Sequence, residues 1–242
     1  MENQPTFKLG AALSAGWKLT WKNFGFILLM MLVIMGICFG IWLLFVAIFG
    51  GVAFLTSINQ SGAGLGTVDT EMSGFIFFLM WLMVPLYLAI LAFSQVVSIG
   101  MQKIYLNMVA EKERKIKDLF IHWNYFLQYL GAGLLLGVII YVGFFFFIFP
   151  GIYFMVKYQF ALTALVDKNL DVKASLDKAA VLSKGNWWKL FASNILLFLI
   201  AFFGFFVFGI GALVTVPLAA LAYVHIYRQL AGEIKVNQAK VN

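Results

Sequence analysis

One lysine inside an apolar stretch is the first group in this sequence that could do chemistry. Lys157 lies in the run FPGIYFMVKYQF, with Tyr153, Tyr158 and Gln159 close to it along the chain. Charged residues within membrane segments are costly and often mark a binding site or a pathway. These four residues are therefore a candidate polar site for an anionic headgroup or substrate. The alternative, which we favour on sequence alone, is that the Lys157 side chain extends outward to lipid phosphates.

A second group combines lysines with tryptophans beside two of the apolar stretches. Its members are Trp17, Lys18, Trp21, Lys22, Lys173, Lys184, Trp187 and Trp188. Tryptophan is enriched at the level of lipid headgroups, and lysine is attracted to anionic phosphates. We expect this group to contact the membrane surface.

Catalytic chemistry is not expected. We find no nucleophile paired with a base, no paired carboxylates in a plausible site, and two isolated histidines with no metal-ligating neighbour. Cys38 is the only cysteine, so an internal disulfide and a cysteine-based metal site are excluded. The sequence therefore predicts no enzyme activity, no cofactor and no metal. The bodies of the expected spans also carry no Asp or Glu, which argues against proton- or sodium-coupled transport.

The composition indicates a membrane protein. Of 242 residues, 63% are hydrophobic and 11% are charged, against roughly 45–50% and about 25% in soluble domains. The net charge of +7 does not indicate nucleic-acid binding, because the basic residues lie between apolar stretches. A cleaved signal peptide is not expected, since the first apolar run is far longer than a signal core.

The uncharged stretches divide into six spans of about 20 residues, the length that crosses a bilayer. Two stretches are too long for one helix and must turn back, one at Pro150-Gly151 and one at Gly209-Ile210-Gly211. The predicted spans are 24–48, 74–101, 126–149, 151–167, 188–208 and 212–230.

The distribution of charge predicts the orientation. With six spans, every Lys and Arg except Lys157 falls at one side of the membrane, in the segments 1–23, 103–118, 167–189 and 228–242, which include the ends of the fifth and sixth spans. The loop 50–73 on the other side carries only Asp69 and Glu71 as charged residues. The positive-inside rule then places both termini in the cytoplasm.

The entry to the first span and the entry to the fifth span look alike. LTWKNF (19–24) and LSKGNW (182–187) share a Leu, a hydroxyl residue, an Asn and an aromatic residue. Ahead of the first, apolar residues at helical spacing predict an amphipathic surface helix with Lys8, Lys18 and Lys22 on its other side. A similar helix is predicted ahead of the second, starting at Asp171 and stopping at Gly185.

A third, degraded copy precedes the third span. Its apolar positions are Ile116, Leu119, Phe120 and Trp123, with Asn124-Tyr125 at the corner. We expect i,i+4 ion pairs from Glu111 to Lys115 and from Glu113 to Lys117 on its wet side. In each copy the Asn side chain is suited to capping a backbone group where the surface helix ends.

The predicted fold is therefore all-α: six transmembrane helices arranged as three hairpins, each preceded by a cytoplasmic amphipathic helix. Residues 1–242 would form a single integral membrane domain with pseudo-repeats at about 1–102, 103–167 and 168–242. The alternative to a repeat is that interfacial helices simply resemble one another.

Several segments resemble a known family. The segments are ALSAGWKLTWKNF (12–24), FPGIYFMVKYQFALTALVD (149–167), KASLDKAAVLSKGNWWKLF (173–191) and HIYRQL (225–230). They are similar to the membrane domain of some bacterial glycerophosphodiester phosphodiesterases and to the stand-alone YciC-like inner-membrane proteins. The resemblance implies a bacterial cytoplasmic-membrane protein. It does not imply the phosphodiesterase activity, because that enzyme works through a separate soluble barrel for which this chain has no room.

These observations predict a non-enzymatic membrane protein that interacts with lipids and their anionic headgroups or docks a membrane partner, including a second copy of itself. The rival prediction is a transporter or pore subunit for a small anionic or amphipathic substrate, with Lys157 in its path.

Overall fold

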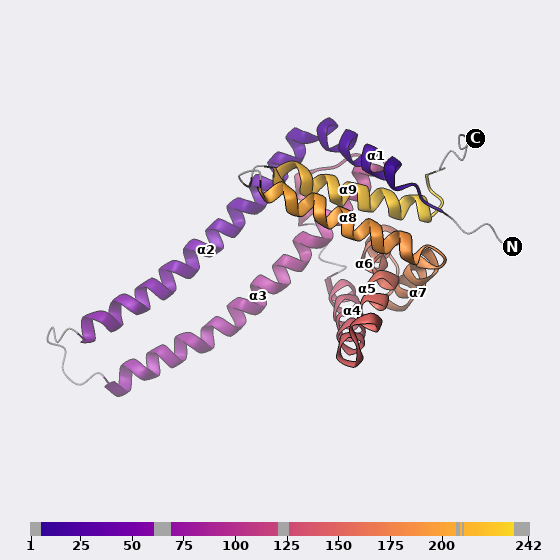
Figure 1. Cartoon of the computed structure of the whole chain (residues 1–242). Coiled ribbons are helices and arrows are strands. Elements are labelled where there is room, and N and C mark those ends of the chain that lie inside the picture. The colour runs from indigo at the N-terminus through magenta and orange to yellow at the C-terminus, as the bar shows by residue number, and fades with distance from the viewer. Residues whose placement is uncertain (1–5, 61–68, 121–125, 207–208, 210, 235–242) are drawn as a thin grey trace, which may run out of the picture. The chain divides into compact units, whose positions relative to one another are not determined.

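The computed structural model describes residues 6–60, 69–120, 126–206, 209 and 211–234, and every element in these ranges is helical (Figure 1). The helices are α1 (Leu9–Lys22), α2 (Phe24–Gln60), α3 (Asp69–Val109), the 3-10 helix η1 (Ile116–Leu119), α4 (Phe126–Phe146), α5 (Ile148–Tyr158), α6 (Ala161–Lys168), α7 (Val172–Ser183), α8 (Trp187–Phe206) and α9 (Ala212–Leu230).

Six helical stretches in this part of the chain are long and apolar enough to cross a membrane. They are Phe24–Ile48, Val84–Val109, Phe126–Phe146, Ile148–Lys168, Trp187–Phe206 and Ala212–Leu230. The number agrees with the sequence prediction, because apolar length alone determines it. The chain therefore has the composition and helix lengths of a multi-pass membrane protein.

The chain divides into two compact units. The first unit contains Met1–Ile27 and Gln95–Asn242, and the second contains Leu28–Ser94. In the second unit, α2 and α3 expose large apolar side chains, among them Met35, Phe39, Trp42, Trp81 and Tyr87. Exposed apolar surface of this extent is expected where lipid, rather than water, surrounds a helix.

Helix α9 forms the centre of the first unit. More than half of its spanning stretch, 61%, is buried, against 11–39% for the other five. Its neighbours α1 and α8 run beside it (Figure 1). Its buried side chains include Leu221, Ile226 and Tyr227.

Helix α1 packs on α9 through small residues. Ala12, Gly16 and Thr20 are buried at one helical face, and a Cβ added at Gly16 would lie 2.9 Å from the Leu218 carbonyl oxygen. The Lys8 amide also donates a hydrogen bond of 2.8 Å to the Gln229 side chain. The side of α1 that carries Trp17 and Trp21 stays exposed.

The two later pairs of spans are in close contact as well. Gly143 of α4 lies so near α5 that an added Cβ would be 2.9 Å from the Gly151 Cα, and Gly204 of α8 lies directly against Thr215 of α9. Glycine at such positions allows the helix backbones to approach.

Some predicted boundaries were wrong. The turn between α4 and α5 falls at Phe147, which is extended with φ −164° and ψ 157°. Pro150-Gly151 instead lies inside the first turn of α5. Proline is tolerated there because the backbone N–H groups of the first turn have no intrahelical acceptor, so the N–H that proline lacks is not needed. Helices α2 and α3 also extend into the predicted loop 50–73. The fourth span is interrupted at Gln159 and Phe160, between α5 and α6.

The predicted surface helix before the third span was also wrong. Only Ile116–Leu119 is helical there, as a short 3-10 turn, and residues 121–125, with Trp123 and Asn124, lie outside the described ranges. Leu119 packs directly on Gly100 of α3. Glu111 adopts a positive φ of 55° and pairs with Lys22, at 2.8 Å, rather than with Lys115.

The two Asn corners are built alike. Asn23 and Asn186 are buried, and each carbonyl oxygen accepts the first hydrogen bond of the following helix, from Ile27 at 3.0 Å and from Leu190 at 2.9 Å. The Asn23 side chain donates to the Leu19 carbonyl at 2.8 Å. It therefore caps the end of α1, as predicted.

Candidate functional site

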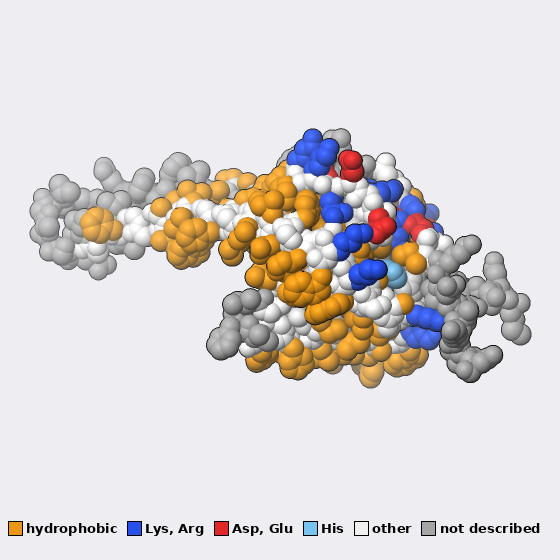
Figure 2. Space-filling model, turned by 90° about the horizontal axis from the view of Figure 1, so that it is seen from above, with side chains coloured by type: hydrophobic (Ala, Val, Ile, Leu, Met, Phe, Trp, Pro, Cys, Tyr) orange, Lys and Arg blue, Asp and Glu red, His pale blue; other side chains and the backbone are white. Residues whose placement is uncertain are grey.

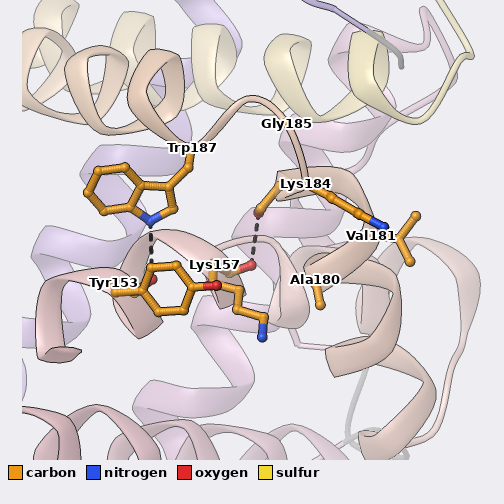
Figure 3. Close-up of a pocket in the computed structure, with 8 residues that line it drawn as sticks. Tyr153, Lys157, Ala180, Val181, Lys184, Gly185 and Trp187 are labelled. Carbon is orange, nitrogen blue, oxygen red and sulfur yellow. Dashed lines mark hydrogen bonds between the residues drawn. The ribbon is translucent and has the colours of Figure 1, made fainter. Parts of the chain in front are cut away.

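A pocket lies between α5, α7 and the turn that leads into α8. Its volume is about 440 Å³, and its lining residues are Tyr153, Lys157, Ala180, Val181, Ser183, Lys184, Gly185 and Trp187 (Figure 3). The two candidate groups of the sequence analysis meet here. Tyr153 and Lys157 come from the polar site in the fourth span, and Lys184 and Trp187 come from the lysine and tryptophan group. We call this space the cationic pocket.

Hydrogen bonds to the backbone of α5 hold the two walls of the cationic pocket together. Ser183 donates to the Lys157 carbonyl at 2.8 Å, and the Trp187 indole N–H donates to the Tyr153 carbonyl at 3.3 Å. Figure 3 draws both bonds. The Trp187 ring also stacks on the Tyr153 ring, with 6.1 Å between centroids. The last carbonyls of a helix lack intrahelical partners, so Ser183 satisfies the end of α5 at Lys157. Trp187 joins the turn to the middle of the same helix, and the two bonds together fix the shape of the pocket.

The sequence provides a local reason for this arrangement. Helix α7 starts at Asp171, whose side chain accepts a hydrogen bond of 3.2 Å from the Ala174 amide. It ends at Ser183, and Gly185 adopts a left-handed φ of 78°, which glycine does at little cost. The chain thus reverses direction within a few residues and carries Lys184 and Trp187 over the side of α5.

The Lys157 ammonium lies between two tyrosine rings, 5.7 Å from the Tyr153 centroid and 5.1 Å from the Tyr158 centroid. Each such contact is worth roughly 0.5–1 kcal/mol at an exposed site. A lysine at the centre of a membrane helix costs about 2.5–3.5 kcal/mol. The two rings thus offset only part of that cost, and water or an anion in the open pocket would have to compensate the rest.

The lysines of the cationic pocket have no acidic partner. Among the residues that the structure describes, no ion pair involves Lys157 or Lys184, whereas Lys22, Lys168 and Arg228 are paired. Lys157 and Lys184 are therefore two positive charges at one pocket without a described carboxylate within 4.0 Å.

Gln159 does not line the cationic pocket. Both polar atoms of its amide are buried without a partner in the described part of the chain, and its carbonyl accepts a hydrogen bond of 2.6 Å from the Tyr223 hydroxyl. The structure thus separates Gln159, at the break of the fourth span, from the Lys157 group in which the sequence analysis placed it. Tyr158 touches the group only through its ring.

The N-terminal lysines and tryptophans lie on α1. Trp17 and Trp21 are 52% and 50% exposed, and their rings meet edge to face at 5.7 Å. Lys18 is exposed beside them, whereas the exposed Lys22 forms an ion pair with Glu111. The hydrogen bond and the charge of Lys22 lower the pKa of Glu111.

In the other half of the group, Trp188 is 75% exposed and its ring contacts Trp187 at 4.7 Å. Lys173 is exposed on α7. Figure 2 shows how Lys and Arg side chains gather, with a few acidic ones among them, on one part of the first unit's surface.

A buried ion cluster was missed by the sequence analysis. Arg228 of α9 donates to Asp167 of α6 at 2.8 Å, and the Tyr227 hydroxyl donates to the same carboxylate at 3.0 Å. Glu233 pairs with Arg228 and with Lys168. The exposed fractions of the Asp167 and Arg228 side chains are only 7% and 11%. Asp167 at the end of the fourth span and Arg228 near the end of the sixth are charges that the sequence shows at the edge of the membrane. Their pairing could not be inferred from the sequence, because it depends on the packing of α6 and α9.

No group of three or more His, Cys, Asp and Glu side chains in the described ranges could hold a metal ion. In the comparisons with known proteins, no family model, no curated protein and no solved structure matches the chain. The class of the protein therefore follows from its own helices, which are those of a multi-pass α-helical membrane protein.

Proposed function

We propose that this protein is a non-enzymatic component of the bacterial cytoplasmic membrane that binds anionic lipid headgroups on the cytoplasmic side. The cationic pocket carries the proposal: Lys157 and Lys184 line one cavity without an acidic partner in the described structure, next to the exposed Tyr153 and the half-buried Trp187. Cationic groups beside amphipathic aromatic rings are the side-chain chemistry of the membrane interface.

The proposed topology has three hairpins with both termini in the cytoplasm, each preceded by a surface segment. The close contacts of α4 with α5 and of α8 with α9 support two of the hairpins. The gathering of lysines in the termini and connections supports the orientation. On α1, the packing on α9 through small residues leaves the tryptophans exposed and available to lipid.

The bacterial assignment rests on the resemblance to the YciC-like proteins and to the membrane domain of glycerophosphodiester phosphodiesterases. The two Asn corners, at Asn23 and Asn186, lie within the segments that carry this resemblance. The three-part repeat is supported by the shared geometry of the corners at Asn23 and Asn186.

Lipid binding can be tested by replacing Lys18, Lys22, Lys173 and Lys184 with Gln. The purified protein is reconstituted into nanodiscs of phosphatidylglycerol mixed with phosphatidylcholine, and enrichment of phosphatidylglycerol around it is measured. We expect the fourfold variant to show less enrichment than the wild type, with Lys22 contributing least because Glu111 already engages it. Equal enrichment in the two proteins would contradict the proposal.

One observation favours the second candidate function, a transporter or pore for a small anionic or amphipathic substrate. The fourth span is interrupted at Gln159 and Phe160, and interrupted spans form the substrate sites of many transporters. The interruption begins two residues after Lys157, and the side-chain amide of Gln159 is buried there without a partner in the described chain.

A flux assay separates the two candidate functions. Lys157→Ala would abolish uptake of an anionic solute by proteoliposomes if the chain forms a path, and Lys173→Ala would serve as a control outside the pocket. If wild-type proteoliposomes are no more permeable than protein-free vesicles to a panel of small anions, the transporter function is wrong.

A further inference from the structure

We infer that the cationic pocket is a discrete site for one glycerophospholipid, whose phosphate contacts Lys157 and Lys184 and whose acyl chains leave the pocket beside Trp187 and Val181. This inference rests on the proposed function and deepens it, because it replaces a general attraction to anionic lipid with one built site for a phosphate.

The charges of the pocket select an anion. Lys157 comes from the last turn of α5 and Lys184 from the turn after α7, so cations of two different elements line the same space (Figure 3). The N-terminal end of α8 also reaches the pocket at Trp187, and this end of a helix carries partial positive charge from its unpaired N–H groups. No acidic side chain of the described ranges is among the lining residues.

The donors of the pocket suit a phosphate. A lysine ammonium binds as a compact charge with three donors and is a common phosphate ligand, whereas a planar carboxylate is usually bound by the fork of an arginine. No arginine lines the pocket. The volume of about 440 Å³ lies in the range of small-molecule sites, roughly 300–1,000 Å³. It therefore suits a headgroup better than a complete lipid.

The walls of the pocket show why the phosphate should belong to a lipid. The Trp187 N–H is already used by the Tyr153 carbonyl, so the indole offers the ligand only an apolar surface. Val181 is 67% exposed, Tyr153 is 46% exposed, and Trp188 adjoins the Trp187 ring with 75% of its surface exposed. These apolar surfaces, next to two cations without a carboxylate partner in the described chain, fit a molecule with a charged head and a hydrocarbon tail.

The walls are also fixed before any ligand binds. Ser183 and Trp187 join the turn to the backbone of α5, so binding does not have to order the wall that carries Lys184. Preorganisation of this kind lowers the entropic cost of binding. It distinguishes this pocket from the exposed lysines on α1 and α7, which lie on open surface.

The protein is reconstituted into nanodiscs of phosphatidylcholine that contain phosphatidylglycerol as a minority lipid. It is then released from the nanodiscs, and native mass spectrometry counts the lipids that stay bound to it. The pocket variant carries Lys157→Gln and Lys184→Gln. The control variant carries Lys18→Gln and Lys173→Gln, which removes the same charge from exposed positions outside the pocket. We expect one tightly retained phosphatidylglycerol on the wild type and on the control variant, and at least tenfold weaker retention on the pocket variant.

Equal retention by the pocket variant and the control variant would overturn the discrete site while leaving the proposed function standing, provided that the wild type still enriches phosphatidylglycerol. A wild type without preference for phosphatidylglycerol would overturn both. Glycerol phosphate and inorganic phosphate are tested as competitors in detergent, and if either binds as tightly as the lipid, a soluble phosphate compound is the ligand and the lipid assignment is wrong. The single variant Lys184→Gln, in an exposed turn, repeats the test without any change inside α5.

Discussion

The buried pair of Asp167 and Arg228 should contribute strongly to stability. Removing one partner of a buried ion pair typically costs about 3–5 kcal/mol, because the other charge remains buried without compensation. Arg228 contacts two carboxylates, those of Asp167 and Glu233. Asp167→Asn leaves Arg228 with Glu233 and keeps an acceptor for Tyr227, so its cost should fall near 3 kcal/mol. Arg228→Gln leaves two carboxylates paired only with the half-exposed Lys168 among the described ion pairs, with Lys103 acting on Asp167 at longer range, so its cost should approach about 5 kcal/mol.

The assay is thermal unfolding of the purified protein in detergent. For a chain of this size, 1 kcal/mol changes Tm by about 2–4 °C, so we expect a loss of about 6–12 °C for Asp167→Asn and about 10–20 °C for Arg228→Gln. The double variant should lose less than the sum of the two. The exposed pair of Lys22 and Glu111 is the control, and its variants should leave Tm nearly unchanged. A smaller loss for Arg228→Gln than for Asp167→Asn would refute this reasoning.

Two further predictions concern the packing of η1 and the acid sensitivity of the α1 corner. Gly100→Ala should lower Tm markedly, because the new Cβ would lie 2.4 Å from the backbone of Leu119. The control Gly36→Ala should be tolerated, because no atom lies within 4 Å of its new Cβ. Equal melting temperatures for the two variants would contradict the packing of Leu119 on Gly100. The lowered pKa of Glu111 means that its bond to Lys22 stabilises the fold at neutral pH and that this contribution is lost as the pH falls through the lowered value. Because this exposed pair hardly changes Tm, the readout is the pKa of Glu111 itself, followed by NMR titration. Lys22→Gln should raise the pKa of Glu111 toward its usual value, and an unchanged pKa would show that the pair is not formed.

The sequence predicted those features that depend on local chemistry. The first spanning stretch is Phe24–Ile48, as expected, because an uninterrupted apolar run fixes both its existence and its start after Asn23. The cap at Asp171 and the left-handed Gly185 also followed from residue type alone. The pocket brings together Lys157 and Lys184, which the sequence analysis had singled out separately.

Features that depend on tertiary packing could not be predicted. Asp167 and Arg228 are 61 residues apart in the chain, and no spacing rule joins them. The i,i+4 spacing of an α-helix predicted that Glu111 pairs with Lys115. The segment does not form an α-helix, and the Glu111 carboxylate pairs with Lys22 instead. The break at Gln159 has no proline or glycine within it, and it occurs where Ser183 and Tyr223 offer donors to the carbonyls of Lys157 and Gln159.

The contact between the start of α1 and the end of α9 has a consequence for biosynthesis. Lys8 and Gln229 are separated by 221 positions, and at about 5–20 residues per second a ribosome needs roughly 10–45 s to make the intervening chain. During that interval, the small-residue face of α1 has no α9 to cover it. Helix α1 therefore leaves the ribosome well before its packing partner α9, and a chaperone or the insertion machinery can bind α1 in that interval.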